Sequence, residues 1–255
     1  LFVWGAAQAD VESVSSVGSS TSAVTVSDAY TQANLTDVHV SDVIAGHGDS
    51  GEHIGYGLSV EGTTVTMLDS SITGATTAGV IVTSGELSLN GVTVQQTSRN
   101  EDGQLGRGLH ADMSIITVLD SSFLDNADAA IYALTASSID IEGTLVQGVG
   151  ASDIDATEGI TSGDGIVITG NDGEHNYDPA MFQGRVVDNE ISGAERAGIV
   201  FEHVAGEFSG NALSDNGLTT SAGVSAFSQD DATVTGDDEV ELLVEGGEIE
   251  PLEFY

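Results

Sequence analysis

The sequence contains no cysteine and no lysine, and proline occurs only twice, at Pro179 and Pro251. Without cysteine the chain forms no disulfide and no thiolate metal site. The scarcity of proline suits uninterrupted strand pairing. Apolar runs are only a few residues long, well short of the roughly 20 that a membrane-spanning helix requires. These absences exclude a disulfide-rich scaffold and direct insertion of this segment into a membrane as a helix.

Positive charge is nearly absent as well. The four basic residues, all arginine, stand against 41 Asp and Glu, which gives a net charge of −37. The arginines are Arg99, Arg107, Arg185 and Arg196. A field of this sign repels nucleic acid, so no nucleic-acid partner is expected. Such a surface is strongly hydrated, suits a salty or extracellular medium, and attracts divalent cations or basic partners.

A phrase of one small residue and three mostly apolar residues recurs along the chain. Its copies begin at Gly57, Gly79, Gly108, Ala130, Gly165, Gly198 and Gly223. The shortest intervals between copies, 79 − 57 and 130 − 108, both equal 22. A period of this length indicates one supersecondary unit stacked on copies of itself.

Each copy is followed by a second phrase, in which two apolar residues are separated by four positions. Met67 with Ile72 and Val118 with Phe123 are examples, and Asp, Ser, Asn and Gly lie between the members. Apolar and polar residues alternate around the first member, which is strand periodicity, and no helical spacing is sustained. The pattern predicts an all-β chain with two or three short strands in each copy, every strand pairing in parallel with its equivalent in the next.

Through these two phrases the sequence resembles the right-handed parallel β-helix repeat proteins of the pectin-lyase-like superfamily. The resemblance implies a solenoid of about eight turns with a core period of about 22 residues, a length typical of stacked repeats. We expect residues 1–22 to form an N-terminal cap or edge segment, 23–236 the β-helix, and 237–255 an acidic C-terminal cap or tail. The resemblance and the acidity together imply a portion of an exported bacterial protein, located outside the cell or on its surface, in a high-salt or marine setting.

The resemblance also shows where catalysis would lie. Polysaccharide-cleaving members of the superfamily carry carboxylates and a base on the outward face of one sheet. The third position of the phrase points outward here, and its occupants are Ser59, Ile81, His110, Tyr132, Val167, Val200 and Ser225. None is acidic, whereas glycoside hydrolysis requires paired carboxylates. The sequence therefore favours a non-catalytic structural, adhesive or assembly module.

An enzymatic alternative stays open. A carbohydrate-active enzyme, either a polysaccharide lyase or a glycoside hydrolase, would use Arg107, His110, Asp112 and Tyr132, because a His–Tyr pair beside Asp and Arg can exchange protons. The competing interpretation is a stacked His–Tyr pair in which Arg107 is bound by a nearby acid such as Asp102.

Two segments carry groups that could bind metal ions. Asn171, Asp172, Glu174 and Asp178 could supply oxygen ligands to calcium, although their spacing matches no EF-hand. His47 and His53, with Asp49 and Glu52 between them, have the makings of a metal-binding loop, and a solvated turn is the competing interpretation. No cofactor is required by the sequence, and calcium is the one left open.

The outward row of Ile81, Tyr132, Val167 and Val200 is unusually apolar for an exposed sheet face and implies that something covers it. Insertions of this chain at 95–106, 149–164 and 170–180 are one candidate. The others are a neighbouring chain and a flat ligand. This row is the predicted interface, and the expected partners are other surface proteins, a second copy, or glycans. A calcium- or carbohydrate-binding module remains a further alternative.

Overall fold

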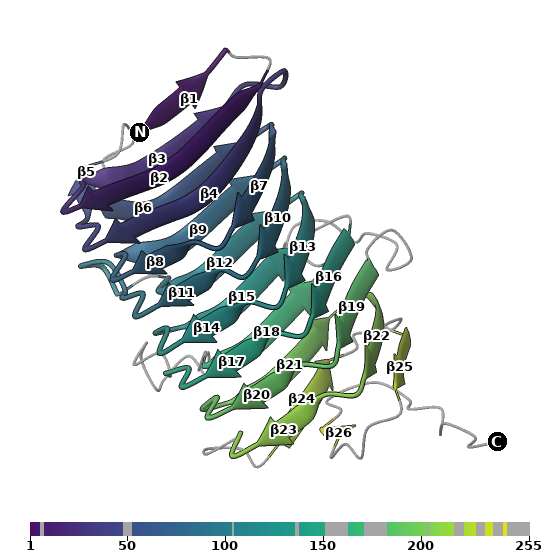
Figure 1. Cartoon of the computed structure of the whole chain (residues 1–255). Coiled ribbons are helices and arrows are strands. Elements are labelled where there is room, and N and C mark those ends of the chain that lie inside the picture. The colour runs from purple at the N-terminus through teal and green to yellow at the C-terminus, as the bar shows by residue number, and fades with distance from the viewer. Residues whose placement is uncertain are drawn as a thin grey trace.

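The computed structural model describes residues 1–5, 8–47, 53–103, 105–135, 138–150, 163–170, 183–202, 204–216, 222–227, 233–236 and 242–243. Every regular element within these ranges is a β-strand, so the all-β prediction is confirmed for the described part of the chain. The strands form two long sheets that run side by side through an elongated stack, from β1 at one end to β26 at the other (Figure 1).

The first sheet, called sheet A, has eleven strands. They are β1 (Phe2–Trp4), β3 (Thr21–Ser27), β5 (Gly46–His47), β6 (His53–Glu61), β9 (Thr77–Thr83), β12 (Arg107–Asp112), β15 (Ala129–Leu134), β18 (Asp164–Thr169), β21 (Ala197–Glu202), β24 (Ala222–Phe227) and β26 (Leu242–Leu243). All neighbours in this sheet are parallel except β5, which pairs antiparallel with β6. β1, which lies within the segment 1–22, is the end strand of this sheet and pairs only with β3 among the described residues.

The second sheet, called sheet B, has fifteen strands. They are β2 (Ala9–Val17), β4 (Gln32–Ser41), β7 (Thr64–Leu68), β8 (Ser71–Thr73), β10 (Glu86–Asn90), β11 (Thr93–Gln95), β13 (Ile115–Leu119), β14 (Ser122–Leu124), β16 (Ser138–Glu142), β17 (Leu145–Gln147), β19 (Gln183–Val187), β20 (Glu190–Ser192), β22 (Ala205–Ser209), β23 (Ala212–Ser214) and β25 (Thr233–Gly236). The long strand β4 pairs with both β7 and β8, and from there the sheet continues as two arms.

Consecutive strands fall into layers of three, one from sheet A and one from each arm of sheet B. Strands β9, β10 and β11 make one layer, and each pairs in parallel with its equivalent in the layer of β12, β13 and β14. Leu109 lies beside Ile131 in the next layer, an interval of 131 − 109 = 22 along the sequence. The repeated phrases therefore correspond to strands in register, as the period predicts.

The two sheets share one hydrophobic core. It runs from Val3 to Val204, and most strands between these residues contribute alternate residues to it. Phe123 and Phe201 are its largest fully buried side chains. Each buried aliphatic or aromatic residue contributes about 1.5–3 kcal/mol through removal of apolar surface from water. Because every layer is packed against the next, this contribution is distributed along the whole stack.

Packing explains why the repeated phrase begins with glycine. A Cβ atom on Gly79 would lie 2.3 Å from the Cγ1 of Val94 and 2.7 Å from the carbonyl oxygen of Gly108. Gly57 and Gly165 are equally confined, each by the backbone of the next layer. The glycine is therefore needed for close approach between strands, since none of these three positions has the backbone angles that favour glycine.

The corner between the two arms of sheet B is made by residues with left-handed backbone angles. These are Asp69, Gly91, Asp120, Gly143, Asp188 and Gly210 in successive layers. The backbone N–H of Asp120 donates to the carbonyl of Glu142 at 3.0 Å, which continues the pairing between layers through the corner. A Cβ on Gly143 would lie 2.6 Å from Oδ1 of Asp120. The alternation of aspartate and glycine therefore leaves room for each carboxylate and keeps like charges two layers apart.

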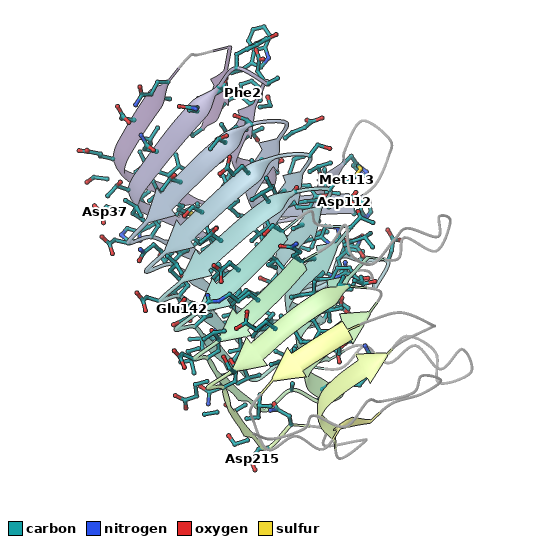
Figure 2. All side chains as sticks on the ribbon, turned by 90° about the vertical axis from the view of Figure 1, so that its right-hand side faces the viewer. Phe2, Asp37, Asp112, Met113, Glu142 and Asp215 are labelled. Carbon is teal, nitrogen blue, oxygen red and sulfur yellow. The ribbon has the colours of Figure 1, made fainter. Side chains whose placement is uncertain are left out.

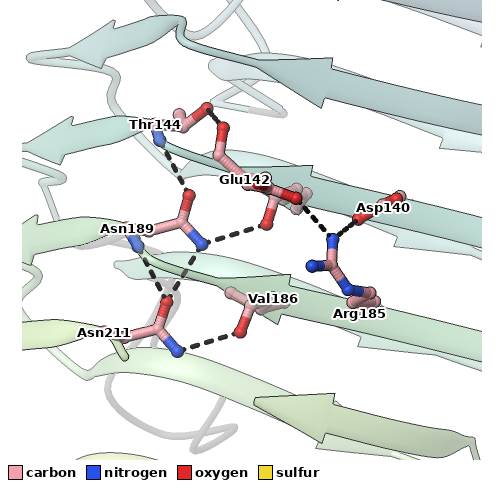
Figure 3. A network of polar contacts seen from close by, with 8 residues as sticks. Asp140, Glu142, Thr144, Arg185, Val186, Asn189 and Asn211 are labelled. Atoms are coloured by element: carbon pink, nitrogen blue, oxygen red, sulfur yellow. Dashed lines mark hydrogen bonds and ion pairs between the residues drawn. The ribbon is translucent and has the colours of Figure 1, made fainter. Parts of the chain in front are cut away.

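Polar side chains that follow this corner satisfy the buried backbone. The backbone N–H of Thr144 donates to Oδ1 of Asn189 at 2.8 Å, and Nδ2 of Asn189 donates to the carbonyl of Ile141 at 3.1 Å (Figure 3). Asn211 repeats the arrangement one layer on, where its Nδ2 donates to the carbonyl of Val186 at 2.9 Å. Since an unpaired buried backbone group costs about 1–3 kcal/mol, these side chains hold the corner in place.

Candidate functional site

The predicted outward row lies on sheet A as expected from the phrase. Ile81 lies beside His110, His110 beside Tyr132, and Tyr132 beside Val167, which is followed by Val200. These side chains come from β9, β12, β15, β18 and β21, one from each layer. The candidate site is the middle of this row, where the polar residues of β12 and β15 meet.

Arg107 is the centre of a compact polar cluster. Its Nε donates to Oδ2 of Asp128 at 2.9 Å, and its NH1 contacts Nδ1 of His110 at 2.6 Å. The guanidinium carbon lies 3.6 Å from the centroid of the Tyr132 ring, a cation–π contact. His110 and Tyr132 stack with ring centroids 5.7 Å apart and planes inclined by 2°. Three of the four candidate catalytic residues therefore come together around one guanidinium.

The surroundings of His110 keep its imidazole neutral. Burial and, secondly, the positive charge of Arg107 lower the pKa of His110 to about 3, while Asp128 opposes the shift. Since Arg107 donates to Nδ1, that nitrogen acts as an acceptor and the proton resides on Nε2. A general acid or base works best when its pKa is close to the working pH. At neutral pH this imidazole is therefore a packed, hydrogen-bonded group.

Asp112 is not part of the cluster. Its Oδ1 accepts a hydrogen bond from the hydroxyl of Thr135 at 2.8 Å, near the far end of β12. The carboxylate that meets Arg107 is Asp128, whose side chain is only 8% exposed. Arg107 therefore pairs with Asp128, and not with Asp102, the nearby acid that the sequence suggests. Asp128 also lies 3.7 Å from the guanidinium of Arg99, so two arginines neutralise it.

Asp128 is a site residue that the sequence reasoning misses, although a signal for it exists. Arg107 and Asp164 each directly precede the glycine of the phrase, and Asp128 and Arg196 each lie two positions before its first residue. When the copies are aligned layer by layer, these positions fall at the same end of neighbouring strands. Charges of opposite sign that recur just before the phrase therefore indicate ion pairs between layers.

A second ion pair lies farther along the same edge of sheet A. Nε of Arg196 donates to Oδ1 of Asp164 at 2.8 Å, and NH2 of Arg196 contacts the other oxygen. Burial raises the pKa of the Asp164 carboxyl, and the hydrogen bond and charge of Arg196 oppose that shift. The arginine thus serves to compensate a buried carboxylate.

The remaining arginine, Arg185, lies on sheet B. Its NH1 donates to Asp140 at 2.7 Å and to Glu142 at 2.8 Å (Figure 3). The hydrogen bond to Glu142 and then that to Asp140 raise the pKa of the guanidinium. All four arginines of the chain are therefore engaged with carboxylates.

The apolar members of the outward row differ in burial. Val167 and Val200 are only 5% and 2% exposed, and together with Ala197 and the partly buried Tyr132 they form a separate small apolar cluster. Ile81 is partly exposed. Val167 and Val200 are therefore covered within a single chain. A contact of this row with a partner stays a prediction.

The predicted calcium ligands Asn171, Asp172, Glu174 and Asp178 lie outside the described residues, as do Asp49 and Glu52. Within the described ranges, no group of three histidine or acidic side chains is arranged ready to hold a metal ion. The same ranges include no apolar helix of membrane-spanning length.

Comparisons with known proteins add little to this geometry. No protein-family model and no curated protein matches the chain. Among solved structures, a protein of Geobacillus virus E2, "ORF18", is similar at 10% identity and a TM-score of 0.35, over 94% of this chain and 52% of that one. The chain thus spans about half the length of the viral protein. The Streptococcus pneumoniae surface protein and adhesin PfbA is similar at 8% identity and a TM-score of 0.25, over 94% and 89%. Likenesses this weak carry no argument about function.

Proposed function

We propose that the chain is a right-handed parallel β-helix of about eight turns, of the pectin-lyase-like kind. The proposal is supported by the three-strand layers, by parallel pairing of each strand with the equivalent strand of the next layer, and by the single core between the sheets. Left-handed corner residues such as Asp69 and Gly74 separate the strands within a layer, as a chain that turns back on itself requires. A stack of this kind is rigid, because each layer is hydrogen-bonded and packed on both sides.

We further propose that this β-helix is a non-catalytic structural, adhesive or assembly module of an exported, acidic bacterial protein. The observation that carries the proposal is the closure of the polar cluster on sheet A. Nε and NH1 of Arg107 are engaged by Asp128 and His110, and burial lowers the pKa of His110 to about 3. The cluster contains one buried carboxylate rather than the acid–base pair that glycosidic cleavage requires.

Assembly is favoured by the end of the stack that carries β1 and β2. Each of these strands pairs on one side only among the described residues, β1 with β3 and β2 with β4. Most of the exposed large apolar side chains of the described residues are in this part of the chain: Leu1, Phe2, Trp4, Val17, Tyr30 and Ile44. Figure 2 shows Phe2 at this end of the stack and Asp215 near the other. An unpaired strand edge beside apolar side chains is a surface on which a further strand can add.

The negative surface is compatible with a partner that is neutral or basic, or with a second copy of the chain at high salt concentration. A net charge of −37 repels anionic polymers, polyuronates included, so the glycans compatible with this surface are uncharged. Contact between two copies requires that this charge be screened by salt. At the ionic strength of sea water the field of an exposed charge extends over only a few ångströms. These conditions agree with the proposed extracellular, high-salt location.

The proposal is tested by two measurements on the whole chain. Incubation with neutral and anionic polysaccharides should release no reducing ends and no unsaturated products above the level of the His110→Ala variant. Sedimentation velocity should show self-association that increases with salt and is weakened by the double substitution Phe2→Ser and Trp4→Ser. Cleavage that depends on His110 contradicts the non-catalytic assignment. A chain that stays monomeric in high salt contradicts assembly through this end.

A further inference from the structure

Two histidines meet on the short hairpin of β5 and β6, away from the cluster on sheet A. His47 and His53 are directly opposite each other in the antiparallel pair, and their rings approach edge-to-face with centroids 4.5 Å apart. This is the antiparallel exception in sheet A, and it is what brings the two imidazoles together. Neither side chain takes part in the core or in the arginine cluster.

A carboxylate from a distant segment completes the group. Glu101, in the connection between β11 and β12, places Oε2 3.4 Å from Nδ1 of His53. The same connection is anchored at this point, because Nδ2 of Asn100 donates to the carbonyl of His53 at 3.2 Å. His47, His53 and Glu101 therefore come from two segments that the fold holds side by side.

The contact between His53 and Glu101 is not a normal hydrogen bond. Nδ1 of His53 is buried and has no hydrogen-bond partner, although Oε2 of Glu101 is 3.4 Å away. Two atoms bound to one zinc ion at 2.0–2.1 Å in tetrahedral geometry lie about 3.3–3.4 Å apart. The observed separation is thus the distance expected between two ligands of one ion. A ring nitrogen without a hydrogen-bond partner that faces the oxygen of a largely exposed carboxylate at this distance can share a cation with it.

We propose that His47, His53 and Glu101 form a binding site for a divalent transition-metal ion of the zinc class. Imidazole nitrogens with one carboxylate are ligands that zinc accepts readily. The three groups do not stand as a ready cage. Binding therefore requires the exposed ring of His47 to turn toward the ion. The large negative charge of the chain favours the arrival of any cation.

Bound metal would link the hairpin of β5 and β6 to the connection after β11. That connection carries Arg99, whose NH2 donates to the carbonyl of Ala127 at 2.6 Å beside the buried Asp128. A ligand that binds only the folded chain raises its stability by mass action. The metal would therefore stabilise the first layers of the stack without taking part in any reaction at the sheet A cluster.

The site is tested by titrating the chelator-treated whole chain with ZnCl2 by calorimetry, in 150 mM NaCl with millimolar MgCl2 to occupy the exposed carboxylates. We expect one zinc ion per chain and a melting temperature that rises with zinc. The variants His47→Ala, His53→Ala and Glu101→Gln should each weaken binding by more than about tenfold. His39→Ala is the matched control, because His39 is an exposed strand histidine beside a carboxylate, Asp37, at 3.0 Å.

Side-chain NMR gives a readout that does not depend on stability. Zinc should shift the ring resonances of His47 and His53 and leave those of His39 in place. Zinc affinity that is unchanged in His53→Ala or Glu101→Gln overturns the proposal, as does loss of binding in His39→Ala to the same extent. If the chain does not bind zinc at micromolar concentration, the contact is a simple His53–Glu101 ion pair and the proposed metal site is overturned.

Discussion

The buried imidazole of His110 makes a sharp prediction about the pH dependence of stability. The pKa of His110 falls from 6.5 to about 3 on folding, chiefly because burial disfavours the charged ring and secondly because Arg107 lies beside it. Between these two values the unfolded chain binds a proton that the folded chain does not. The free energy of unfolding therefore decreases as the pH falls through 6.5, and the contribution of His110 is complete only above that value.

The size of the effect follows from the same numbers. A pH of 5 lies about 1.5 units below the pKa of His110 in the unfolded chain. Each pH unit corresponds to about 1.36 kcal/mol of free energy. Protonation of His110 in the unfolded chain should therefore lower the free energy of unfolding by about 2 kcal/mol between pH 8 and pH 5. Any folded pKa below about 4 gives the same figure, because the folded ring is neutral throughout that range.

The perturbation is His110→Gln, which keeps a hydrogen-bond acceptor for Arg107 and removes the titrating ring. Urea unfolding at pH 8 and pH 5 should show that the wild type loses about 2 kcal/mol more than the variant. The substitution His39→Gln, at an exposed position, serves as the control for the replacement of a histidine as such. An NMR titration of the His110 ring should show no protonation down to pH 4.5. A midpoint near 6.5, or equal pH dependence in wild type and His110→Gln, would refute the reasoning.

Two further predictions concern the stack itself. Gly79→Ala should lower the free energy of unfolding by at least about 2 kcal/mol, because the new Cβ meets Val94 at 2.3 Å, whereas Gly150→Ala should cost less than about 1 kcal/mol because its nearest neighbour is 3.9 Å away. Urea unfolding of the two variants measures the difference. Asn189→Ala leaves the backbone N–H of Thr144 without its acceptor, so a loss of about 1–3 kcal/mol is expected. Faster amide hydrogen exchange of Thr144 is the local readout, and unchanged exchange would contradict the role assigned to Asn189.

The strand layers could be predicted because they repeat. The interval from Gly79 to Gly108 is longer than that from Gly57 to Gly79, yet both pairs belong to neighbouring layers. The repeated phrase identifies the strands despite the insertion, since close approach between layers leaves no room for a Cβ atom at its first position in copies such as those of Gly57, Gly79 and Gly108. A local pattern with a strong steric cause is thus readable from one sequence.

The partner of Arg107 could not be predicted in the same way. Asp102 and Asp112 lie close to Arg107 in the sequence, and a pattern within one copy favours such near acids. In the structure Asp112 lies toward the other end of β12, where it accepts from Thr135. Asp128 reaches Arg107 because it comes from the next layer. Contacts between layers depend on register, which a motif within one copy does not contain.

The distribution of the four arginines connects stability with function. Asp128 and Asp164 are the buried carboxylates of the described residues, and each is paired with arginine. An unpaired buried carboxylate is strongly destabilising, so a chain with so few cations can bury only as many acids as its guanidinium groups can compensate. Asp69, Asp120 and Asp188, at the corner where aspartate alternates with glycine, are exposed and need no such compensation.

The same distribution limits what the surface can bind. Because Arg99, Arg107, Arg185 and Arg196 are all engaged with carboxylates, no lysine or uncommitted arginine remains to attract an anionic ligand. Cleavage or binding of an acidic polysaccharide would require breaking one of these ion pairs, which leaves a carboxylate such as Asp128 buried and unpaired. Among the proposed partners, neutral chains, cations and strands that add beside β1 or β2 avoid that cost.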